Sequence, residues 1–184
     1  ISFKGELDAS AIPADGISKA KLKVTIKEAT SKKAISNAEV SLAAAHGTII
    51  NKIKTDDQGI AEATLTSYTK ALTDTIFLEY GNVFADTLTI NYEMPKIDLT
   101  PDIAYLIADG SSKKTFTASV KSQENTPIVD AEIKFSTTNG TISPSSVFTN
   151  SQGLAQATLT SAAEVDNNVI IIARLNDYAD TSHV

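Results

Sequence analysis

The sequence contains no cysteine and only one arginine, Arg174. Without cysteine there can be no disulfide, no thiolate nucleophile and no cysteine-ligated zinc site. The net charge is −6, so phosphate backbones and anionic lipid surfaces would be repelled at long range, and one guanidinium forms no cluster to bind them. No apolar run reaches the roughly 18 residues of a membrane-spanning helix. These absences predict no nucleic-acid partner and no direct membrane insertion of this segment.

The most informative feature that is present is an internal repeat. Residues 55–67 return as residues 149–161 with 9 of 13 positions identical, 94 residues further along the 184-residue chain. An Ala-Asp-Gly turn around Asp15 returns around Asp109 at the same spacing. A repeat of this length is a whole small domain, because solenoid units usually span roughly 20–50 residues. A position shared by both copies is expected to serve the fold, since a catalytic site is seldom needed twice in tandem.

Each copy is predicted to be a β-sandwich. Residues 20–27 alternate apolar and charged side chains without a break, and residues 116–121 keep the same phase. Such period-two alternation indicates strands with one buried face, and Gly-containing turns separate them at short intervals. Residues 75–80 and 169–174 carry apolar side chains on both faces, so the sequence does not show which face is buried. No stretch sustains a helical apolar spacing.

The predicted fold class is therefore all-β: two tandem immunoglobulin-like sandwiches joined end to end by a short linker, at residues 1–94 and 95–184. Only a few residues around Pro95 separate the last strand of the first copy from the first strand of the second. Proline stiffens such a joint and donates no ladder hydrogen bond. The sequence begins at Ile1 without a leader-like segment, so we expect any export signal to lie outside it.

The ordered motifs resemble a known family. An Ala-Asp-Gly turn, an Asn-Ala-Glu-Val or Asp-Ala-Glu-Ile segment, a Gly-Thr-Ile step and a Gly-x-Ala-x-Ala-x-Leu-Thr-Ser strand occur in that order in both copies. This arrangement is similar to the bacterial Ig-like group 1 domains of the intimin/invasin adhesins. The resemblance implies stalk domains on a bacterial cell surface, with the parent protein attached to the outer membrane. It carries over no catalytic residue.

Several polar residues could form a functional site or could serve the fold. His46 precedes a glycine where the other copy has Asn139, and both residue types tolerate positive φ, so a shared turn conformation is expected. Asp56 lies in a turn that could supply oxygens to calcium. The second copy has Asn150 there, which favours a plain turn. Asp86 and Asp180, like the Ala-Asp-Gly aspartates, are expected to accept backbone N–H bonds in turns. No catalytic or metal site and no cofactor is predicted.

Aromatic residues without a twin are the remaining binding candidates. Tyr68 and Tyr105 are predicted as possible contact residues, because tyrosine is favoured at protein and sugar interfaces. Tyr92 and Tyr105 also lie near the joint, where packing between the domains is the simpler interpretation.

The predicted function is a non-enzymatic spacer of a bacterial surface adhesin, which projects a binding region from the cell and supports adhesion. A host-cell surface protein or glycan would be reached through the parent protein. Two alternatives stay open. The pair could itself bind a receptor or glycan, or it could be an accessory part of a secreted enzyme.

Overall fold

A computed structural model describes residues 1–102 and 105–184 of the chain. These residues form sixteen strands and no helix, so the all-β prediction is confirmed. The chain divides into two compact units, Ile1–Glu93 and Met94–Val184. The boundary predicted from the sequence lies one residue later.

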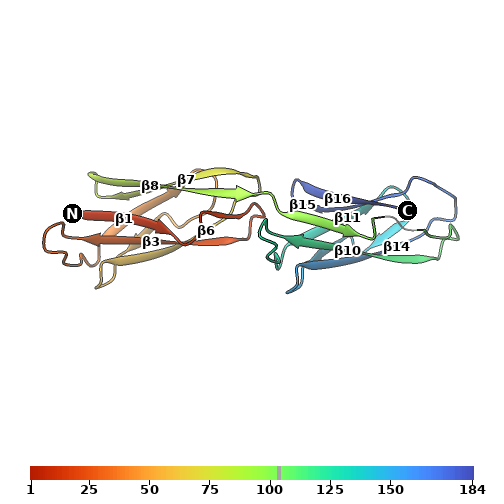
Figure 1. Ribbon diagram of the computed structural model, residues 1–184, viewed down its shortest axis with the longest axis horizontal. Helices are drawn as coiled ribbons and strands as arrows, with labels where there is room; N and C mark the ends of the chain where they lie inside the picture. The colour runs from red at the N-terminus through yellow and green to blue at the C-terminus, as the bar shows by residue number, and fades with distance from the viewer. Residues whose placement is uncertain (103–104) are drawn as a thin grey trace. The chain divides into compact units, whose positions relative to one another are not determined.

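The first unit is a sandwich of two sheets. In Figure 1, β7 and β8 lie on the opposite side of this unit from β1, β3 and β6. The smaller sheet has the order β1 (Ser2–Leu7), β3 (Lys19–Lys27), β6 (Ile60–Thr66). The larger sheet has the order β2 (Ala11–Pro13), β8 (Phe84–Glu93), β7 (Leu72–Tyr80), β4 (Glu39–Ala44), β5 (Lys52–Lys54).

The second unit repeats this plan with two sheets of four strands (Figure 1). One has the order β12 (Thr141–Ser143), β14 (Leu154–Thr160), β10 (Lys113–Lys121), β9 (Lys96–Thr100). The other has the order β13 (Ser146–Phe148), β11 (Glu132–Thr137), β15 (Ile170–Leu175), β16 (Tyr178–His183).

Alternation along the central strands builds the core. On β3, Leu22, Val24 and Ile26 are fully buried while Lys21 and Lys23 face solvent. Leu22 lies opposite the small Ala63 of β6, and in the second unit Phe116 lies opposite Ala157 in the same register. Small residues opposite large ones let the two sheets interdigitate. Each buried aliphatic side chain contributes roughly 1.5–3 kcal/mol to stability.

The structure shows which face of β7 is buried, a question that the sequence did not settle. On β7 the buried positions are Asp74, Ile76 and Leu78, whereas Phe77 is half exposed. The strand pairing shows that the correspondence between the two copies shifts by one residue here. Leu78 lies opposite Asp86, whereas Ala173 lies opposite Asp180. The turn between β15 and β16 is one residue shorter than the turn between β7 and β8. Residues of β15 therefore correspond to β7 at a spacing of 95 rather than 94.

The first unit also has a strand for which the second has no counterpart among its described residues. β2 runs parallel to the end of β8, with Ala11, Ile12 and Pro13 opposite Asn91, Tyr92 and Glu93. In the second unit the residues at the matching spacing, 105–107, belong to no strand. This difference leaves the two units unlike each other at one end of the larger sheet.

Candidate functional site

The aspartate of each Ala-Asp-Gly turn is a scaffold residue. The Asp15 carboxylate accepts the N–H groups of Ile17 and Ser18 at 2.8 and 2.7 Å. Asp109 accepts the N–H groups of Ser111 and Ser112 at 2.8 and 2.6 Å in the same way. The following glycines have φ of +81° and +71°, which only glycine adopts readily. The prediction of a hydrogen-bonded turn is confirmed in both units.

The hydroxyl and N–H bonds of Ser112, followed by the N–H of Ser111, hold the pKa of Asp109 well below its ordinary value. These donors favour the ionised form of the carboxyl, because a carboxylate accepts them more strongly than the neutral acid does.

A buried threonine ties a loop to the sheet in both units. The Thr55 hydroxyl accepts the Ala38 N–H at 2.9 Å and donates to the Ile35 carbonyl at 2.7 Å. Thr149 makes the corresponding pair of bonds at the same two distances. A hydroxyl that both donates and accepts satisfies two backbone groups that burial would otherwise leave unpaired.

The Asp86 and Asp180 pair joins the two sheets of each sandwich, which corrects the expectation that they lie in turns. Asp86 lies within β8 and accepts the Gly5 N–H of β1 at 3.0 Å. Asp180 lies within β16 and accepts the Leu99 N–H of β9 at 2.8 Å. An alternating strand directs each carboxylate toward the neighbouring sheet, so these residues act between strands.

The turn considered as a calcium site has the same hydrogen bonds whether its first residue is a charged aspartate or a neutral asparagine. Asp56 accepts the N–H groups of Gln58 and Ile60 at 2.8 and 2.9 Å. Asn150 does the same at 2.9 and 3.1 Å with its amide oxygen. The predicted turn is present in both units, with the same pair of hydrogen bonds. Across the described residues, no group of three or more metal-ligating side chains is close enough to hold an ion.

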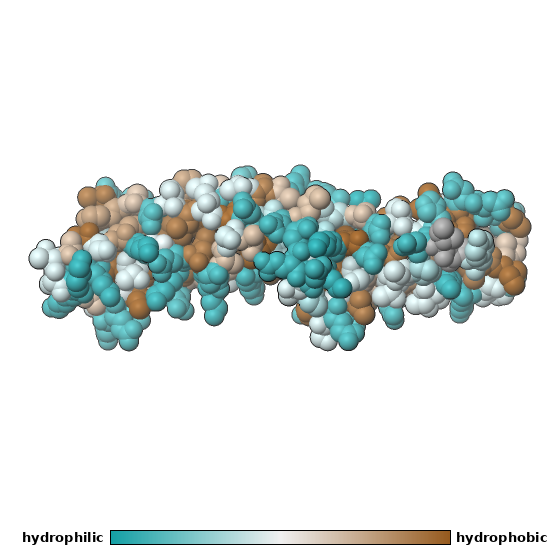
Figure 2. Space-filling view, viewed as in Figure 1, coloured by the Kyte–Doolittle hydropathy of each residue, from teal (hydrophilic) through white to brown (hydrophobic). Residues whose placement is uncertain are grey.

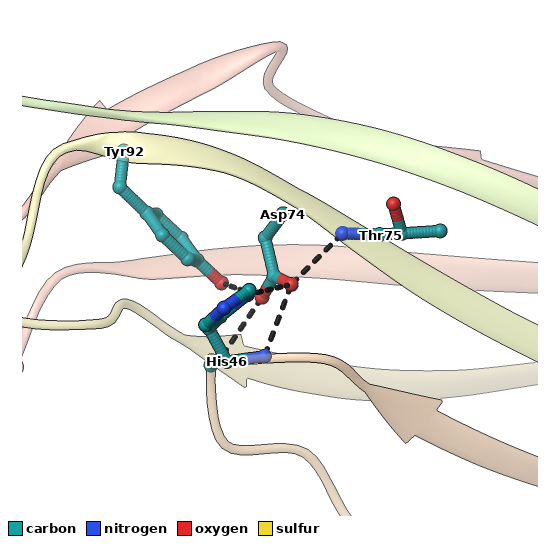
Figure 3. Close-up of polar contacts among 5 residues, drawn as sticks. His46, Asp74, Thr75 and Tyr92 are labelled. Carbon is teal, nitrogen blue, oxygen red and sulfur yellow. Dashed lines mark hydrogen bonds and ion pairs between the residues drawn. The ribbon is translucent and has the colours of Figure 1, made fainter.

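Among the described residues, a polar cluster specific to the first unit surrounds Asp74, whose side chain is fully buried. Figure 3 shows the Tyr92 ring and the His46 side chain converging on its carboxylate from different segments. The Tyr92 hydroxyl donates at 2.9 Å and the Gly47 N–H at 2.7 Å to one oxygen. The other oxygen accepts the His46 and Thr75 N–H groups at 3.0 and 2.8 Å, and the His46 ring Nδ1 lies 3.3 Å away.

The environment keeps this carboxylate charged. Burial by itself would raise the pKa of Asp74, but the bonds from Gly47, Tyr92, His46 and Thr75 outweigh it and hold the pKa below the ordinary value of 3.8. Burial, followed by the bond to Asp74, raises the pKa of Tyr92 well above its ordinary value. Tyr92 therefore stays a protonated donor and Asp74 an ionised acceptor across physiological pH.

This geometry corrects one sequence-based expectation. Neither His46 nor Asn139 has positive φ, so the exchange does not reflect a shared left-handed turn. His46 instead donates to Asp74, whereas the Asn139 side chain accepts the N–H of Gly140 at 2.8 Å. Tyr92 is 2% exposed, and its hydroxyl binds Asp74 within the first unit.

The two predicted contact tyrosines are placed very differently. Tyr68 follows β6 and is half buried, with its ring centroid 5.6 Å from that of His46. It therefore covers the Asp74 cluster. Tyr105 lies outside the strands and is 92% exposed. The two tyrosines belong to different units.

Sequence reasoning missed Asp74 although a signal existed. Asp74 is two residues before the buried Ile76 and four before the buried Leu78, so an inward phase for β7 would have placed a carboxylate in the core. A buried carboxylate needs several donors. The arrangement offers little chemistry: both oxygens are engaged by N–H and O–H donors, and no solvent reaches the carboxylate. Asp74 anchors the loop that carries His46 to β7.

The surface mixes apolar and polar residues. On the face shown in Figure 2, hydrophobic residues are interspersed with hydrophilic ones over both units. The exposed large apolar residues include Phe77, Val83, Ile107 and Val165. In the described parts of the chain, no helix has the length and apolarity needed to cross a bilayer.

Comparison with known families agrees with this architecture. The profile of invasin domain 3 matches residues 4–95, and that of the bacterial Ig-like domain (group 1) matches residues 96–184. The chain belongs to the bacterial Ig-like family of the intimin/invasin adhesins. The resemblance deduced from the ordered motifs is thereby confirmed. No curated protein matches the chain.

Solved structures of this family share the fold with the chain. Invasin, titled a bacterial integrin-binding protein, is 20% identical over 100% of this chain and 39% of its own, with a TM-score of 0.50. The D0–D1 domains of intimin are 23% identical over 98% of both chains, with a TM-score of 0.46. A 282-residue intimin fragment, solved with the intimin-binding domain of its translocated receptor, is 18% identical over 100% of this chain and 64% of the fragment, with a TM-score of 0.49. The chain thus spans well under half of invasin.

Proposed function

We propose that this pair of domains is a non-enzymatic spacer in a bacterial surface adhesin, displayed outside the cell by a parent protein attached to the outer membrane. The proposal rests on one observation: the same polar side chains bind backbone groups in both units. The aspartates of the Ala-Asp-Gly turns, the threonines Thr55 and Thr149, and the inter-sheet aspartates bind backbone groups alike in both units. Polar residues that close each sandwich are already engaged and are not available for a ligand.

The remaining unit-specific cluster also favours a passive role. The Asp74 carboxylate is buried and saturated with donors, so it can neither activate a nucleophile nor reach a ligand. Only Met94 and Pro95 separate the last strand of one unit from the first strand of the next. A two-residue joint containing proline restricts the freedom of the chain between the units. Restricted joints between closed domains are what a stalk requires.

A competition assay tests the spacer role. Bacteria that carry the full-length adhesin are added to host cells in the presence of excess soluble 1–184 pair. We expect attachment to be unchanged, because a spacer occupies no receptor. Competition by the pair, with attachment falling as its concentration rises, would contradict the proposal. Soluble parent protein lacking only residues 1–184 is the matched positive control.

A second candidate function rests on Tyr105 alone. Its 92% exposure, with Ile107 73% exposed beside it, fits a contact to a host-cell protein or glycan by the parent protein. Tyr68 fits this less well, because its ring covers His46. Binding of the isolated pair to a glycan array or to host cells that Tyr105→Ala abolishes and Tyr68→Ala does not would favour this candidate over the spacer.

A further inference from the structure

The second unit contains an asparagine that is followed directly by glycine, Asn139–Gly140. Each of the nine other asparagines of the chain precedes a larger residue. The difference matters chemically, because a backbone nitrogen can attack the side-chain amide of the asparagine before it and release ammonia. Glycine has no Cβ to shield its nitrogen from that amide. Asn139 is therefore the asparagine of this chain that is best suited to the reaction.

The structure places the two reacting groups together. The Gly140 N–H donates to the Asn139 side-chain oxygen at 2.8 Å, and a carbonyl carbon lies only about 1.23 Å from its oxygen. The nitrogen thus lies next to the carbon that it would attack, which favours the reaction by proximity. The Thr137 hydroxyl holds the asparagine backbone in this turn, because it accepts the Asn139 N–H at 3.3 Å and donates to the Asn139 carbonyl at 2.6 Å.

The first unit binds the equivalent glycine differently. Gly47 follows a histidine and donates its N–H to the buried Asp74 carboxylate at 2.7 Å. The second unit has Val169 at the position of Asp74, and a valine side chain accepts no hydrogen bond. The Gly140 N–H is bound instead by the side chain of the residue before it. The reactive arrangement thus follows from the replacement of the buried carboxylate.

The nitrogen that would leave takes part in a contact with a neighbouring loop. The Asn139 side-chain N–H donates to the Asp166 carboxylate at 3.3 Å. The other oxygen of Asp166 accepts the Asn168 N–H at 2.9 Å, which holds this carboxylate in the loop. The amide of Asn139 therefore ties the start of β12 to the segment before β15.

We propose that Asn139 is a site of spontaneous deamidation, which turns its hydrogen bond to Asp166 into a contact between like charges. The Gly140 nitrogen gives up its proton to solvent and bonds to the side-chain carbonyl carbon. The bond from that carbon to Nδ2 breaks, and Nδ2 takes up a proton and leaves as ammonia. Water then opens the cyclic succinimide at either of its carbonyls, which leaves aspartate or isoaspartate at position 139. Water is the only co-reactant.

Both products disturb the second unit. Either one puts a second carboxylate beside Asp166, and like charges at this separation repel. Isoaspartate also lengthens the main chain at Asn139–Gly140, directly before β12. Space is short there, because a Cβ at Gly140 would lie 2.5 Å from the Thr160 carbonyl oxygen. Deamidation therefore weakens the attachment of β12 and of the loop that carries Asp166.

Peptide mapping by mass spectrometry tests the site. The folded pair is kept in a mildly alkaline buffer, which helps the backbone nitrogen to lose its proton, and deamidation is followed at each asparagine. We expect conversion at Asn139 to be at least about tenfold faster than at Asn125, an exposed asparagine of the same unit that precedes threonine. Equal rates at these two asparagines would overturn the proposal.

The variant Asn139→Asp reproduces one product and tests its consequence. We expect it to lower the unfolding midpoint of the second unit by about 2–4 °C and to leave the first unit unchanged. Addition of Asp166→Asn should remove this loss, because the facing charge is then gone. Asn150→Asp is the matched control: it adds the same charge where the first unit has Asp56, and it should not lower the midpoint. A loss that persists with Asp166→Asn, or an equal loss in Asn150→Asp, would overturn the assigned contact between like charges.

Discussion

At the residue scale, Asp74 makes the first unit sensitive to acid. Its folded-state pKa lies below the ordinary 3.8 of an exposed aspartate, so its stabilising contribution is complete above that value and is lost as pH falls through the folded-state pKa. We predict that Asp74→Asn lowers the stability of the first unit by about 1–3 kcal/mol at pH 7. The same change should flatten the fall in its stability as pH drops below 3.8.

Chemical denaturation at a series of pH values measures this. The second unit is an internal control, because Val169 occupies the corresponding position and the acid response of Asp109 is untouched by the substitution. An unchanged acid slope of the first unit in Asp74→Asn would show that the carboxylate is not the titrating group.

The Tyr92 hydroxyl has a separable contribution. Tyr92→Phe keeps the buried ring but removes the 2.9 Å bond to the charged carboxylate. Hydrogen bonds to charged groups contribute roughly 1.5–3 kcal/mol, so a loss of stability of about that size is expected in urea denaturation. Tyr105→Phe removes the hydroxyl of a side chain that is 92% exposed and should change stability by less than about 0.5 kcal/mol. Similar losses for both variants would contradict the role given to Tyr92.

The sequence predicted the polar residues with local partners well and those with distant partners poorly, for a physical reason. Residues such as Asp15 and Asp56 bind N–H groups within a few positions of themselves, so local turn chemistry predicts their role. Asp74 binds Gly47 and Tyr92, which are far away in the chain. Neither contact follows from local pattern until the pairing of β4, β7 and β8 is known.

At the scale of single elements, the turn before β14 depends on a glycine. Gly153 has φ of +73°, and a Cβ there would lie 2.5 Å from the Val120 carbonyl oxygen. Gly81 has φ of +59° with nothing within 4 Å of its Cβ position, so it isolates the backbone preference from the clash. We predict that Gly153→Ala destabilises the second unit by about 2–4 kcal/mol, against about 1 kcal/mol for Gly81→Ala in the first.

Thermal unfolding followed by circular dichroism measures both variants. Gly59 offers a repeat of the test, since its Cβ would lie 2.3 Å from the Ile26 carbonyl oxygen. Equal effects of the Gly153 and Gly81 substitutions would mean that the close backbone approach is relieved without cost.

Strand identity could be predicted from alternation, but the register of β7 and β15 could not. Residues 20–27 have one apolar face, which fixes their phase, and β3 follows it. Residues 75–80 offer Phe77 on one face and Ile76 and Leu78 on the other, so either face could be inward. The one-residue difference between the β7–β8 and β15–β16 turns then shifted the apparent correspondence between the two copies.

At the scale of the whole molecule, the chain forms two closed sandwiches whose common polar residues serve the fold. Family membership supports an adhesin, and the engaged carboxylates and hydroxyls support a role without a ligand of its own. If that is correct, the number and size of the domains matter for adhesion and the identity of their surface residues does not.

Replacement of the pair in the intact adhesin tests this most directly. Residues 1–184 are exchanged for two unrelated Ig-like domains of equal length, and attachment of the bacteria to host cells is counted beside a strain that lacks the pair. We predict attachment within about twofold of the parent strain for the exchange, and a clear loss for the deletion. Loss of attachment in the exchanged strain, with the adhesin present at the surface in normal amount, would contradict the spacer function.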